Sequence, residues 1–335
     1  MRIVTNVGLA SHWRASSGCE GEAVKAHTLR EFLAALPESD VVLVDCNPGV
    51  LLALAALFTV LPRLRRPLLG SDIVLRQPES LRSWLTHPCR RFLLGRVDHY
   101  FRTYQDTRAV QKYFGIGPEQ STYYPFKPNL RYHCDEAPQA EGAYVLCLGR
   151  SMRDFDSFFK AMELTGLPGA IAEPDLPRLR ANGSRFTRPL ARLPANVRRL
   201  PHNPDDHASQ AAILREAKLV VVALRKSCLV ATGTPYNAML LGKCVLVTEG
   251  PATNGMFTDE VLTMPAEDPA GMARVIERAW NDATLRTTTA ARGHALALTL
   301  GGTPEMKQRL LDLTVAWMDQ GGSHTSAHAA SARAR

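Results

Sequence analysis

Residues 232–250, TGTPYNAMLLGKCVLVTEG, place three small or rigid residues before an apolar helix and end in a run suited to a buried strand. We interpret Thr234 as the helix N-cap, Pro235 as the first helical residue and Asn237 as the third. The preceding run, KLVVVAL (218–224), has the length and β-branched content of another buried strand. This strand–helix–strand order predicts a parallel sheet.

The same alternation of strands and helices continues along the chain and is interrupted once, by polar, proline-containing residues 127–142. We therefore predict an α/β protein of two doubly wound, Rossmann-like domains that face each other. The predicted bounds are 1–132 and 133–302, with a helix at 303–320 packing back on the first domain and a disordered tail at 321–335. The main predicted elements before the interruption are strands at 2–6, 40–45, 67–72 and 121–127, helices at 21–36 and 50–61, and a strand, turn and helix over 97–116. Those after it are strands at 144–148, 167–173, 196–200, 218–224 and 244–248, and helices from 155, over 211–217, from 234 and over 268–282.

Length and composition are those of a globular protein. The chain has 335 residues, 45% of them hydrophobic and 21% charged, which is enough for two hydrophobic cores. Its seven cysteines show no C-x-x-C spacing, so we predict neither a metal site nor a disulfide framework. The longest apolar run, 50–61, is too short to span a bilayer, and the N-terminus lacks the apolar core of a signal peptide. We therefore expect a cytoplasmic location.

The basic charge is concentrated in one segment. The chain carries a net charge of +8, and residues 60–132 alone hold thirteen Lys and Arg against five acids. Such a segment favours an anionic partner, either a membrane face, a phosphorylated substrate or nucleic acid, although a solvated surface explains it equally well. No nucleic-acid-binding module is recognisable, so we expect an anionic membrane surface, at the inner face, rather than nucleic acid.

Two loops at predicted strand ends carry the residue types that bind anions. In open parallel sheets, ligands bind beyond the carboxyl ends of the strands. Thr232, Gly233 and Thr234 lead into a helix whose first N–H groups and dipole favour an anion, and Arg150 and Arg153 follow the strand at 144–148. A guanidinium is well suited to a diphosphate. The alternatives are an ordinary capped helix and surface arginines paired with nearby aspartates.

The order of these motifs resembles that of the GT-B glycosyltransferases, most closely family 4, over nearly the whole chain. YVLCLGRSMRD (144–154) is similar to the family's strand that ends in Gly-Arg, and LREAKLVVVAL (214–224) to the family's next central strand. The opening stretch resembles the family's LLEAMACGKPVIAT segment, and EDPAGMARVIERAWND (267–282) its Asp-Pro-led helix. The resemblance implies the GT-B fold, a nucleotide-diphosphate sugar as donor and a retaining reaction.

The resemblance also implies roles for particular residues. Arg150 would bind the donor diphosphate, and the backbone of residues 232–234 would support a phosphate or the sugar. The lysine that the family has after Gly-Arg is absent here, and Arg153 is the cation nearest to its position in the sequence. The family's two glutamates, which contact the donor sugar and the ribose, correspond to Leu229 and Asn237 here, and Asn237 can still bind a ribose hydroxyl. With arginine and helix dipole to neutralise the phosphates, no metal and no cofactor are expected.

The first domain offers an acid for the acceptor. Where the family often has a histidine, at the end of the third strand, this chain has Ser71 and Asp72. Asp72 is our candidate for the group that accepts a proton from the acceptor hydroxyl, although a helix cap explains it equally well. Asp45 and Asn47, at the end of the second strand, are weaker candidates.

We therefore predict a glycosyltransferase that moves a sugar from a nucleotide diphosphate to a carbohydrate acceptor, lipid-linked or part of a growing polysaccharide. A GT-B protein that binds a sugar nucleotide or a partner without turnover is the alternative that the missing glutamates favour. A non-hydrolysing epimerase would need further carboxylates around the sugar, and a dehydrogenase would need G-x-G-x-x-G after the first strand, which is absent.

Overall fold

The computed structural model describes residues 1–133, 142–203, 205–229 and 233–321, and the chain divides into two compact units. The first unit comprises Met1–Pro125 and the chain from Pro304, and the second comprises Phe126–Thr303. The division after Pro125 lies before the boundary at 132/133 that the sequence predicts. Apart from Gly321, the predicted tail lies outside the described residues.

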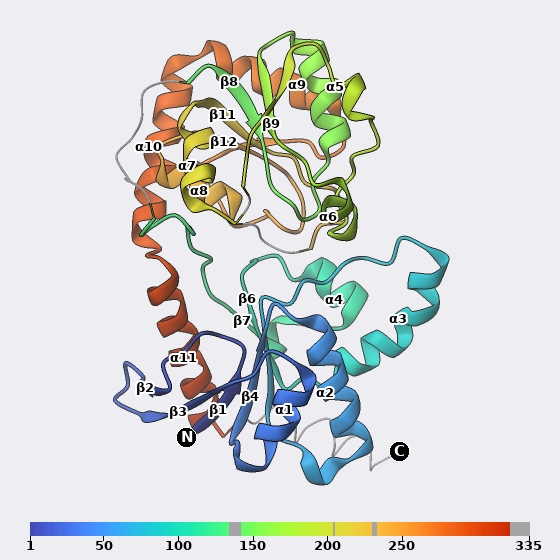
Figure 1. The fold of residues 1–335 in the computed structure, drawn as a ribbon, viewed down its shortest axis with the longest axis vertical. Helices are drawn as coiled ribbons and strands as arrows, with labels where there is room; N and C mark the ends of the chain where they lie inside the picture. The colour runs from blue at the N-terminus through green and yellow to red at the C-terminus, as the bar shows by residue number, and fades with distance from the viewer. Residues whose placement is uncertain (134–141, 204, 230–232, 322–335) are drawn as a thin grey trace. The chain divides into compact units, whose positions relative to one another are not determined.

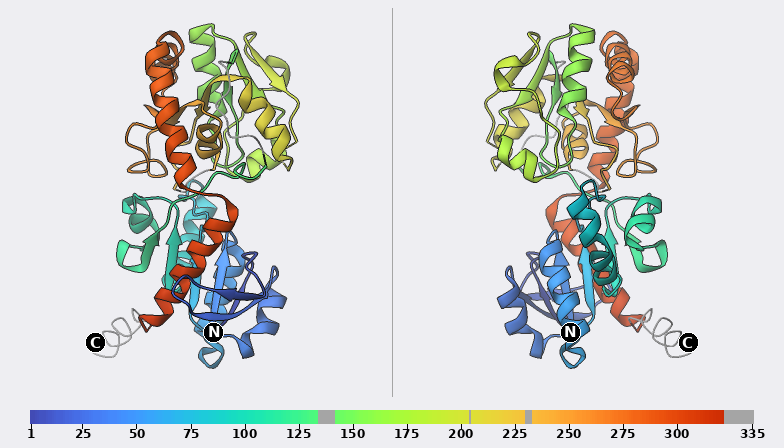
Figure 2. Two further views of the ribbon diagram at one scale, coloured as in Figure 1. Left: turned by 90° about the vertical axis from the view of Figure 1, so that its left-hand side faces the viewer. Right: turned by 90° about the vertical axis from the view of Figure 1, so that its right-hand side faces the viewer.

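The first unit is built on a seven-stranded sheet of order β2-β3-β1-β4-β5-β6-β7. All of its neighbouring strands pair in parallel except β2 and β3, which pair antiparallel. Figures 1 and 2 show the helices on both faces of the sheet. The strands are β1 (Arg2–Thr5), β2 (His12–Arg14), β3 (Glu20–Lys25), β4 (Val41–Asp45), β5 (Leu68–Ser71), β6 (His99–Arg102) and β7 (Ser121–Tyr123). The helices are α1 (Leu29–Ala35), α2 (Pro48–Val60), α3 (Leu81–Leu94), α4 (Arg108–Phe114) and α11 (Thr303–Asp319), with 3₁₀ turns at Leu36–Glu38, Pro62–Leu64 and Pro118–Gln120.

The helix predicted over 21–36 is wrong in its first half, which forms β3. A side chain at Gly21 would lie 2.0 Å from the carbonyl oxygen of Met1 and 2.3 Å from the Trp13 ring, so the backbone here is held against its neighbours in the sheet. The helix begins only after Thr28, whose hydroxyl accepts from the N–H of Glu31 while the Glu31 carboxylate accepts from the N–H of Thr28. This reciprocal cap fixes the helix start at Leu29, eight residues later than predicted.

The second unit is built on a six-stranded, wholly parallel sheet of order β10-β9-β8-β11-β12-β13. The strands are β8 (Tyr144–Cys147), β9 (Gly169–Ala172), β10 (Val197–Leu200), β11 (Ala217–Val222), β12 (Cys244–Thr248) and β13 (Leu262–Met264). The helices are α5 (Phe155–Thr165), α6 (Leu176–Ala181), α7 (His207–Arg215), α8 (Thr234–Leu240), α9 (Pro269–Asn281) and α10 (Ala283–Thr299), with a 3₁₀ turn at Leu190–Arg192. The sheet has the doubly wound form that the sequence predicts.

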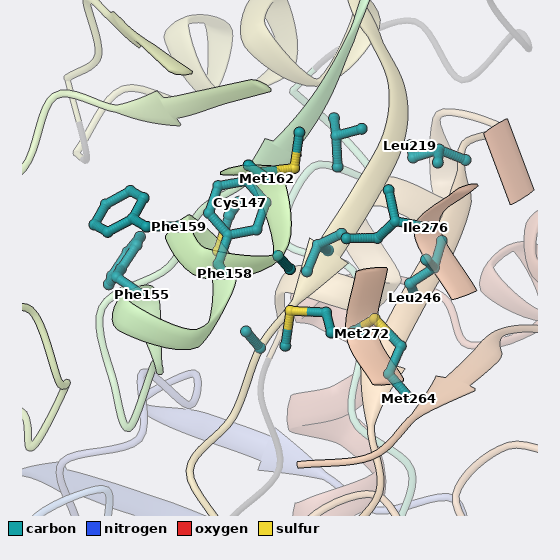
Figure 3. Close-up of a cluster of buried hydrophobic side chains, with 14 of the residues drawn as sticks. Cys147, Phe155, Phe158, Phe159, Met162, Leu219, Leu246, Met264, Met272 and Ile276 are labelled. Atoms are coloured by element: carbon teal, nitrogen blue, oxygen red, sulfur yellow. The ribbon is translucent and has the colours of Figure 1, made fainter. Parts of the chain in front are cut away.

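Each sheet is anchored by an apolar layer on its faces. In the second unit, side chains from β8, β11 and β12 pack against α5 and α9 around Phe158, Met162 and Met272, all fully buried (Figure 3). In the first unit, α11 contributes Leu310 and Val315 to the core that lies over β1, β4 and β5. These cores fix the strands, so the loops at their carboxyl ends start from rigid positions.

Candidate functional site

The loop after β8 folds the Arg153 side chain back beneath its own backbone. Gly149 has φ +115°, and a Cβ there would lie 2.3 Å from Nη2 of Arg153, so only glycine allows this turn. The guanidinium is 1% exposed and donates to the carbonyls of Leu148 (3.0 Å) and Ser151 (2.8 Å) and to the hydroxyl of Thr234 (2.8 Å). Burial lowers its pKa. Arg153 thus ties the β8 loop to α8, and its donors point at protein atoms.

The start of α8 differs from the prediction by one position. Gly233 is the N-cap, Thr234 is the first helical residue and Pro235 the second, and no side chain caps the helix. The Thr234 hydroxyl accepts from Arg153 instead of from the helix backbone. Gly233 is needed for a different reason, because a Cβ there would lie 2.9 Å from the Phe126 ring and 3.0 Å from the Asn129 amide. The predicted residue Thr232 lies outside the described residues.

The two positions that correspond to family glutamates are interior positions of the second unit. Leu229 is fully buried in the core. Asn237 is 1% exposed; its oxygen accepts from the N–H groups of Asn129 (2.6 Å) and Leu130 (3.3 Å), and its nitrogen donates to Gln210 (3.3 Å). The Asn237 amide therefore holds the start of the second unit against α8, which is a structural role in place of the predicted ribose contact.

Arg150 is the predicted arginine whose side chain reaches the surface. It is 46% exposed, and its nearest acid, Asp205, is 74% exposed and 3.9 Å away. Asp205 is also 3.8 Å from Arg178. Exposed pairs of this kind contribute about 0–1 kcal/mol, so an incoming anion can displace Asp205. The backbone oxygen of Arg150 accepts from the hydroxyl of Ser184 (2.6 Å), which fixes the loop but leaves the side chain unconstrained.

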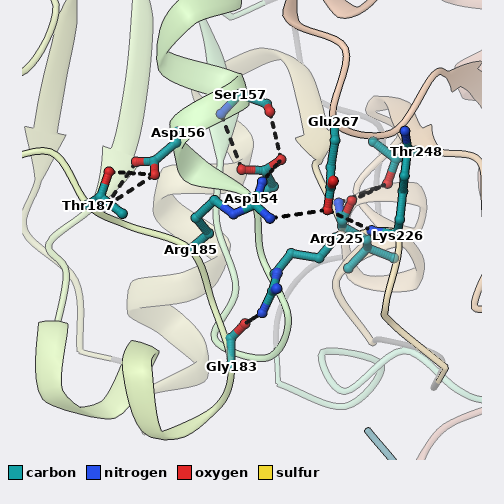
Figure 4. A network of polar contacts seen from close by, with 11 residues as sticks. Asp154, Asp156, Ser157, Gly183, Arg185, Thr187, Arg225, Lys226, Thr248 and Glu267 are labelled. Carbon is teal, nitrogen blue, oxygen red and sulfur yellow. Dashed lines mark hydrogen bonds and ion pairs between the residues drawn. The ribbon is translucent and has the colours of Figure 1, made fainter. Parts of the chain in front are cut away.

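Further charged groups that the sequence analysis did not select lie at the same edge (Figure 4). Arg185 lies 3.7 Å from Asp154 and 3.5 Å from Glu267, and Glu267 also accepts from the N–H of Lys226 (3.2 Å). Arg225 donates to the carbonyl of Gly183 (3.0 Å). Arg225 and Lys226 come three and four residues after the end of β11, so the strand-end rule that selected Arg150 selects them as well. Arg185 lies in an irregular segment, where no pattern marks it.

In the first unit, the ends of β4 and β5 bring Asp72 into contact with a thiol and a hydroxyl. Asp72 accepts from the hydroxyl of Thr103 (2.8 Å) and from the thiol of Cys46 (3.4 Å). Cys46 and Asp72 both have positive φ, +50° and +45°, a conformation that non-glycine residues adopt at a cost. Next to them, the hydroxyls of Ser71 and Tyr124 lie 2.9 Å apart.

Burial dominates the electrostatics of this cluster. It raises the pKa of Asp72, and the hydrogen bonds from Thr103 and Cys46 oppose that shift. Burial also raises the pKa of Cys46, with the Asp72 charge adding to the effect, and of Tyr124 and Tyr104. The phenols and the thiol are therefore protonated at neutral pH, and Asp72 is the member of the cluster suited to accept a proton.

Two features are absent from the part of the chain that the structure describes. Among residues 1–133, 142–203, 205–229 and 233–321, no group of three or more His, Cys, Asp or Glu side chains is arranged to hold a metal ion. Over the same residues, none of the helices has both the length and the apolar character needed to cross a bilayer.

No family model matches the sequence, and a search of curated proteins gives no match. Solved structures are similar in fold. Sucrose-phosphate synthase from Thermosynechococcus elongatus has a TM-score of 0.65 at 15% identity, over 92% of this chain and 87% of that chain. HepE from Anabaena in complex with UDP-glucose has 0.65 at 12% identity, over 86% and 82%. Trehalose 6-phosphate synthase from Burkholderia multivorans has 0.60 at 13%, over 87% and 75%. The chain therefore has the fold of the GT-B glycosyltransferases, as predicted from its sequence.

Proposed function

We propose that the protein transfers a sugar from a nucleotide-diphosphate donor, held at the edge of the second unit, to an acceptor held at the edge of the first. The observation that carries this is Arg150, half-exposed beyond β8 and only loosely paired, with Lys226 exposed beyond the neighbouring β11. Two exposed cations in the loops that follow adjacent strands suit a diphosphate, which needs two charges neutralised. HepE, which has the same fold, is in complex with UDP and UDP-glucose in solved structures.

Arg153 has a positioning role in this proposal. Its three hydrogen bonds fix the loop that carries Arg150 relative to the first turn of α8, so Arg150 starts from a defined backbone. The hydrogen bond from Arg153 to Thr234 joins this loop to the start of α8, where the backbone of Gly233 and Thr234 supports the donor. Because arginine, lysine and backbone N–H groups can neutralise the phosphates, the donor site works without a metal ion.

The Asp72 cluster supplies the acceptor side of the proposal. A carboxylate whose pKa is raised by burial is a stronger base than an exposed one, and the hydroxyl of Thr103 holds one of its oxygens in place. The acceptor oxygen then attacks the face of the sugar from which the bond to the phosphate breaks, the nucleoside diphosphate leaves, and Asp72 takes the proton of the acceptor hydroxyl. We propose retention of the sugar's configuration, and a lipid-linked or growing polysaccharide as the acceptor.

The test is a binding and product assay on the full chain. Calorimetry with UDP, GDP, ADP and TDP should give binding of at least one nucleotide, and the corresponding sugar nucleotide should then release free nucleotide slowly through hydrolysis. Transfer to simple sugar acceptors and to polyprenyl-linked sugars, followed by NMR of the anomeric proton, reports acceptor class and configuration. If none of the nucleotides binds, the donor site is wrong.

A second function is favoured by a specific observation. Leu229 and Asn237 are both taken up by packing and by backbone contacts, so neither offers a carboxylate to a donor sugar. A protein of this fold that binds a sugar nucleotide without turnover is consistent with that arrangement. Nucleotide binding together with no hydrolysis and no transfer, over the whole donor panel, would favour this second function.

A further inference from the structure

Helix α3 of the first unit exposes large apolar side chains along most of its length. It packs against α2 and α4, yet its only buried residue is Leu94. Leu81 is 78% exposed, Leu85 74%, Trp84 52% and Phe92 51%. A folded protein rarely leaves so many large apolar side chains of one helix in water, and such a patch indicates an interaction surface.

The exposed apolar residues lie on one side of the helix. Their spacing of three, four, seven and eleven residues from Leu81 places Trp84, Leu85, Pro88 and Phe92 within a single stripe of an α-helix. The opposite side carries Leu94, which faces the protein. In Figure 1, α3 lies beyond α2 at the outside of its unit, with one side turned away from the sheet. We call Leu81, Trp84, Leu85, Pro88 and Phe92 the α3 stripe.

The charged side chains of α3 itself are all positive. Arg82 and Arg91 are exposed and flank it on its two sides, and the helix sequence LRSWLTHPCRRFLL contains no acid. The Arg96 guanidinium lies 4.7 Å from the centre of the Phe92 ring. A hollow of about 500 Å³ lies on the other side of the first turns of α3, away from the α3 stripe, and is lined by Arg76, Gln77, Pro78, Glu79, Ser80, Ser83, Thr86, His87 and Arg90.

We propose that α3 is an interfacial helix that lies in the surface of an anionic bilayer, with the α3 stripe in the acyl boundary and Arg82 and Arg91 among the lipid phosphates. A helix with tryptophan, leucine and phenylalanine on one face and arginines beside them has the composition of such helices. The inference deepens the acceptor side of the proposed function and rests on it, because a membrane-bound protein meets lipid-linked acceptors at the bilayer surface.

Charge decides against the other occupants. Residues 60–132 carry an excess of eight positive charges, so two copies brought together through α3 repel each other. Nucleic acid would match the charge but would leave the α3 stripe facing phosphates. An anionic bilayer matches both the charge and the apolar side chains.

Arg65 and Arg66 are less suited to a test of this surface. Arg65 pairs with the buried Asp98 at 2.6 Å, and Arg66 donates to the carbonyl of Ser39 at 2.8 Å. Their replacement would disturb the fold as well as the charge. Arg82 and Leu85 avoid this difficulty because both are exposed, whereas Arg91 is exposed but donates to the carbonyl of Lys112 at 3.3 Å, so Arg82→Glu is also tested alone.

The experiment is co-sedimentation of the full chain with vesicles of phosphatidylcholine alone or mixed with phosphatidylglycerol. We expect binding to the mixed vesicles, reduced by salt, and little binding to phosphatidylcholine. One surface cation lost weakens binding to an anionic bilayer about fivefold, so Arg82→Glu with Arg91→Glu should weaken it at least about thirtyfold. Leu81→Gln with Leu85→Gln should weaken it about tenfold or more. Trp84, the most exposed of the four tryptophans, should shift its fluorescence to the blue with mixed vesicles.

Matched variants on the second unit separate this surface from general effects. Arg274→Glu with Arg278→Glu makes the same charge change on α9, also with one site in a last helical turn, and Leu164→Gln replaces a leucine of α5 that is 62% exposed. These variants should bind vesicles as the wild type does. Equal losses in both sets, no binding to mixed vesicles, or an α3-dependent dimer in sedimentation equilibrium would each overturn the inference. Nucleotide binding is measured by calorimetry in parallel. If vesicle binding fails and nucleotide binding is found, only the inference about α3 is overturned. If vesicle binding is found and nucleotide binding fails, only the proposed function is overturned.

Discussion

The carboxyl edges of the two sheets differ in charge although both follow the same topological rule. In the second unit, Arg150 and Lys226 lie in loops that follow strands and Arg185 lies in the segment after α6, and the acids near them are pairing partners. In the first unit, the contact at the ends of β4 and β5 is built around Asp72 with a thiol and a hydroxyl. One edge is suited to an anion and the other to a proton. The fold supplies two equivalent positions, and the side chains decide which substrate each can take.

The two edges are alike in backbone strain. The described residues contain four non-glycine residues with positive φ, and they fall into two pairs: Cys46 and Asp72 in the first unit, Met152 and Glu267 in the second. All four lie in loops beyond strands or directly before a helix. Strain of this kind costs about 1–3 kcal/mol per residue and is retained where the surroundings fix the loop, so each edge has a rigid loop pair.

The largest effect is expected on turnover, from Asp72→Asn at the carboxyl edge of the first unit's sheet. Loss of a general base lowers turnover by about a hundred- to ten-thousandfold, while the amide keeps the size and can still contact Thr103. Donor binding, measured by calorimetry, should not change, because the donor edge belongs to the other unit. A variant with wild-type turnover would show that Asp72 is structural.

The same variant should alter the pH dependence of stability. Burial raises the pKa of Asp72 in the folded chain above its value in the unfolded chain, which is near 3.8. At a pH between these two pKa values, the folded chain keeps the Asp72 proton and the unfolded chain has released it. Wild-type stability from this group therefore falls as pH rises through that window. Asp72→Asn does not share the loss, so its stability relative to wild type should be greatest at neutral pH and shrink toward pH 4. Urea unfolding at both pH values measures the difference.

Arg153→Ala should give the next largest effect, on folding. It leaves the carbonyls of Leu148 and Ser151 and the hydroxyl of Thr234 without their guanidinium donor in the interior, which we expect to lower the free energy of unfolding by about 3 kcal/mol. Arg150→Ala is the matched control, three residues away, and should leave unfolding almost unchanged. Equal stability of the two variants would contradict the division into a positioning and a binding arginine.

The sequence predicts those structural elements that follow from a regular pattern of apolar residues. The strands at β4, β8 and β11 and the two-unit α/β fold follow from apolar runs and their alternation, and they were predicted. The antiparallel β2 and β3 were missed, because the close approach of Gly21 to Met1 involves residues that are distant in sequence.

The candidate site shows the same limit. The strand-end rule located the loops that hold Arg150 and Arg153 but could not tell which guanidinium turns inward, because that depends on the glycine conformation at 149 and on contact with α8. It could not show either that the Asn237 amide is occupied by backbone N–H groups from Asn129 and Leu130. Contacts between distant segments decide the side-chain roles.

Arg150→Ala sharpens the comparison from the side of the second edge. A charge-assisted hydrogen bond contributes about 1.5–3 kcal/mol, so the variant should bind a nucleotide diphosphate roughly ten- to a hundredfold more weakly. Arg150→Lys should recover part of the affinity, since a point charge cannot make two parallel hydrogen bonds. Arg178→Ala, which removes the other arginine near Asp205, is the control and should bind as wild type does. Calorimetry on the four proteins decides whether the diphosphate binds at Arg150.

The smallest effect concerns strain, and it asks whether the two edges store it in the same way. Cys46→Ala and Cys46→Gly both remove the thiol and its bond to Asp72, so they differ only in the Cβ that the left-handed backbone disfavours. The glycine variant should be more stable than the alanine variant by about 1 kcal/mol, against the usual order of these residues. Met152→Ala and Met152→Gly should show the same order in the second unit, although both lose the packing of a side chain that is 2% exposed. Urea unfolding measures each pair. If alanine is the more stable at Cys46 but not at Met152, strain is stored at the donor edge alone, and the rigidity inferred for the Asp72 loop has to come from its hydrogen bonds.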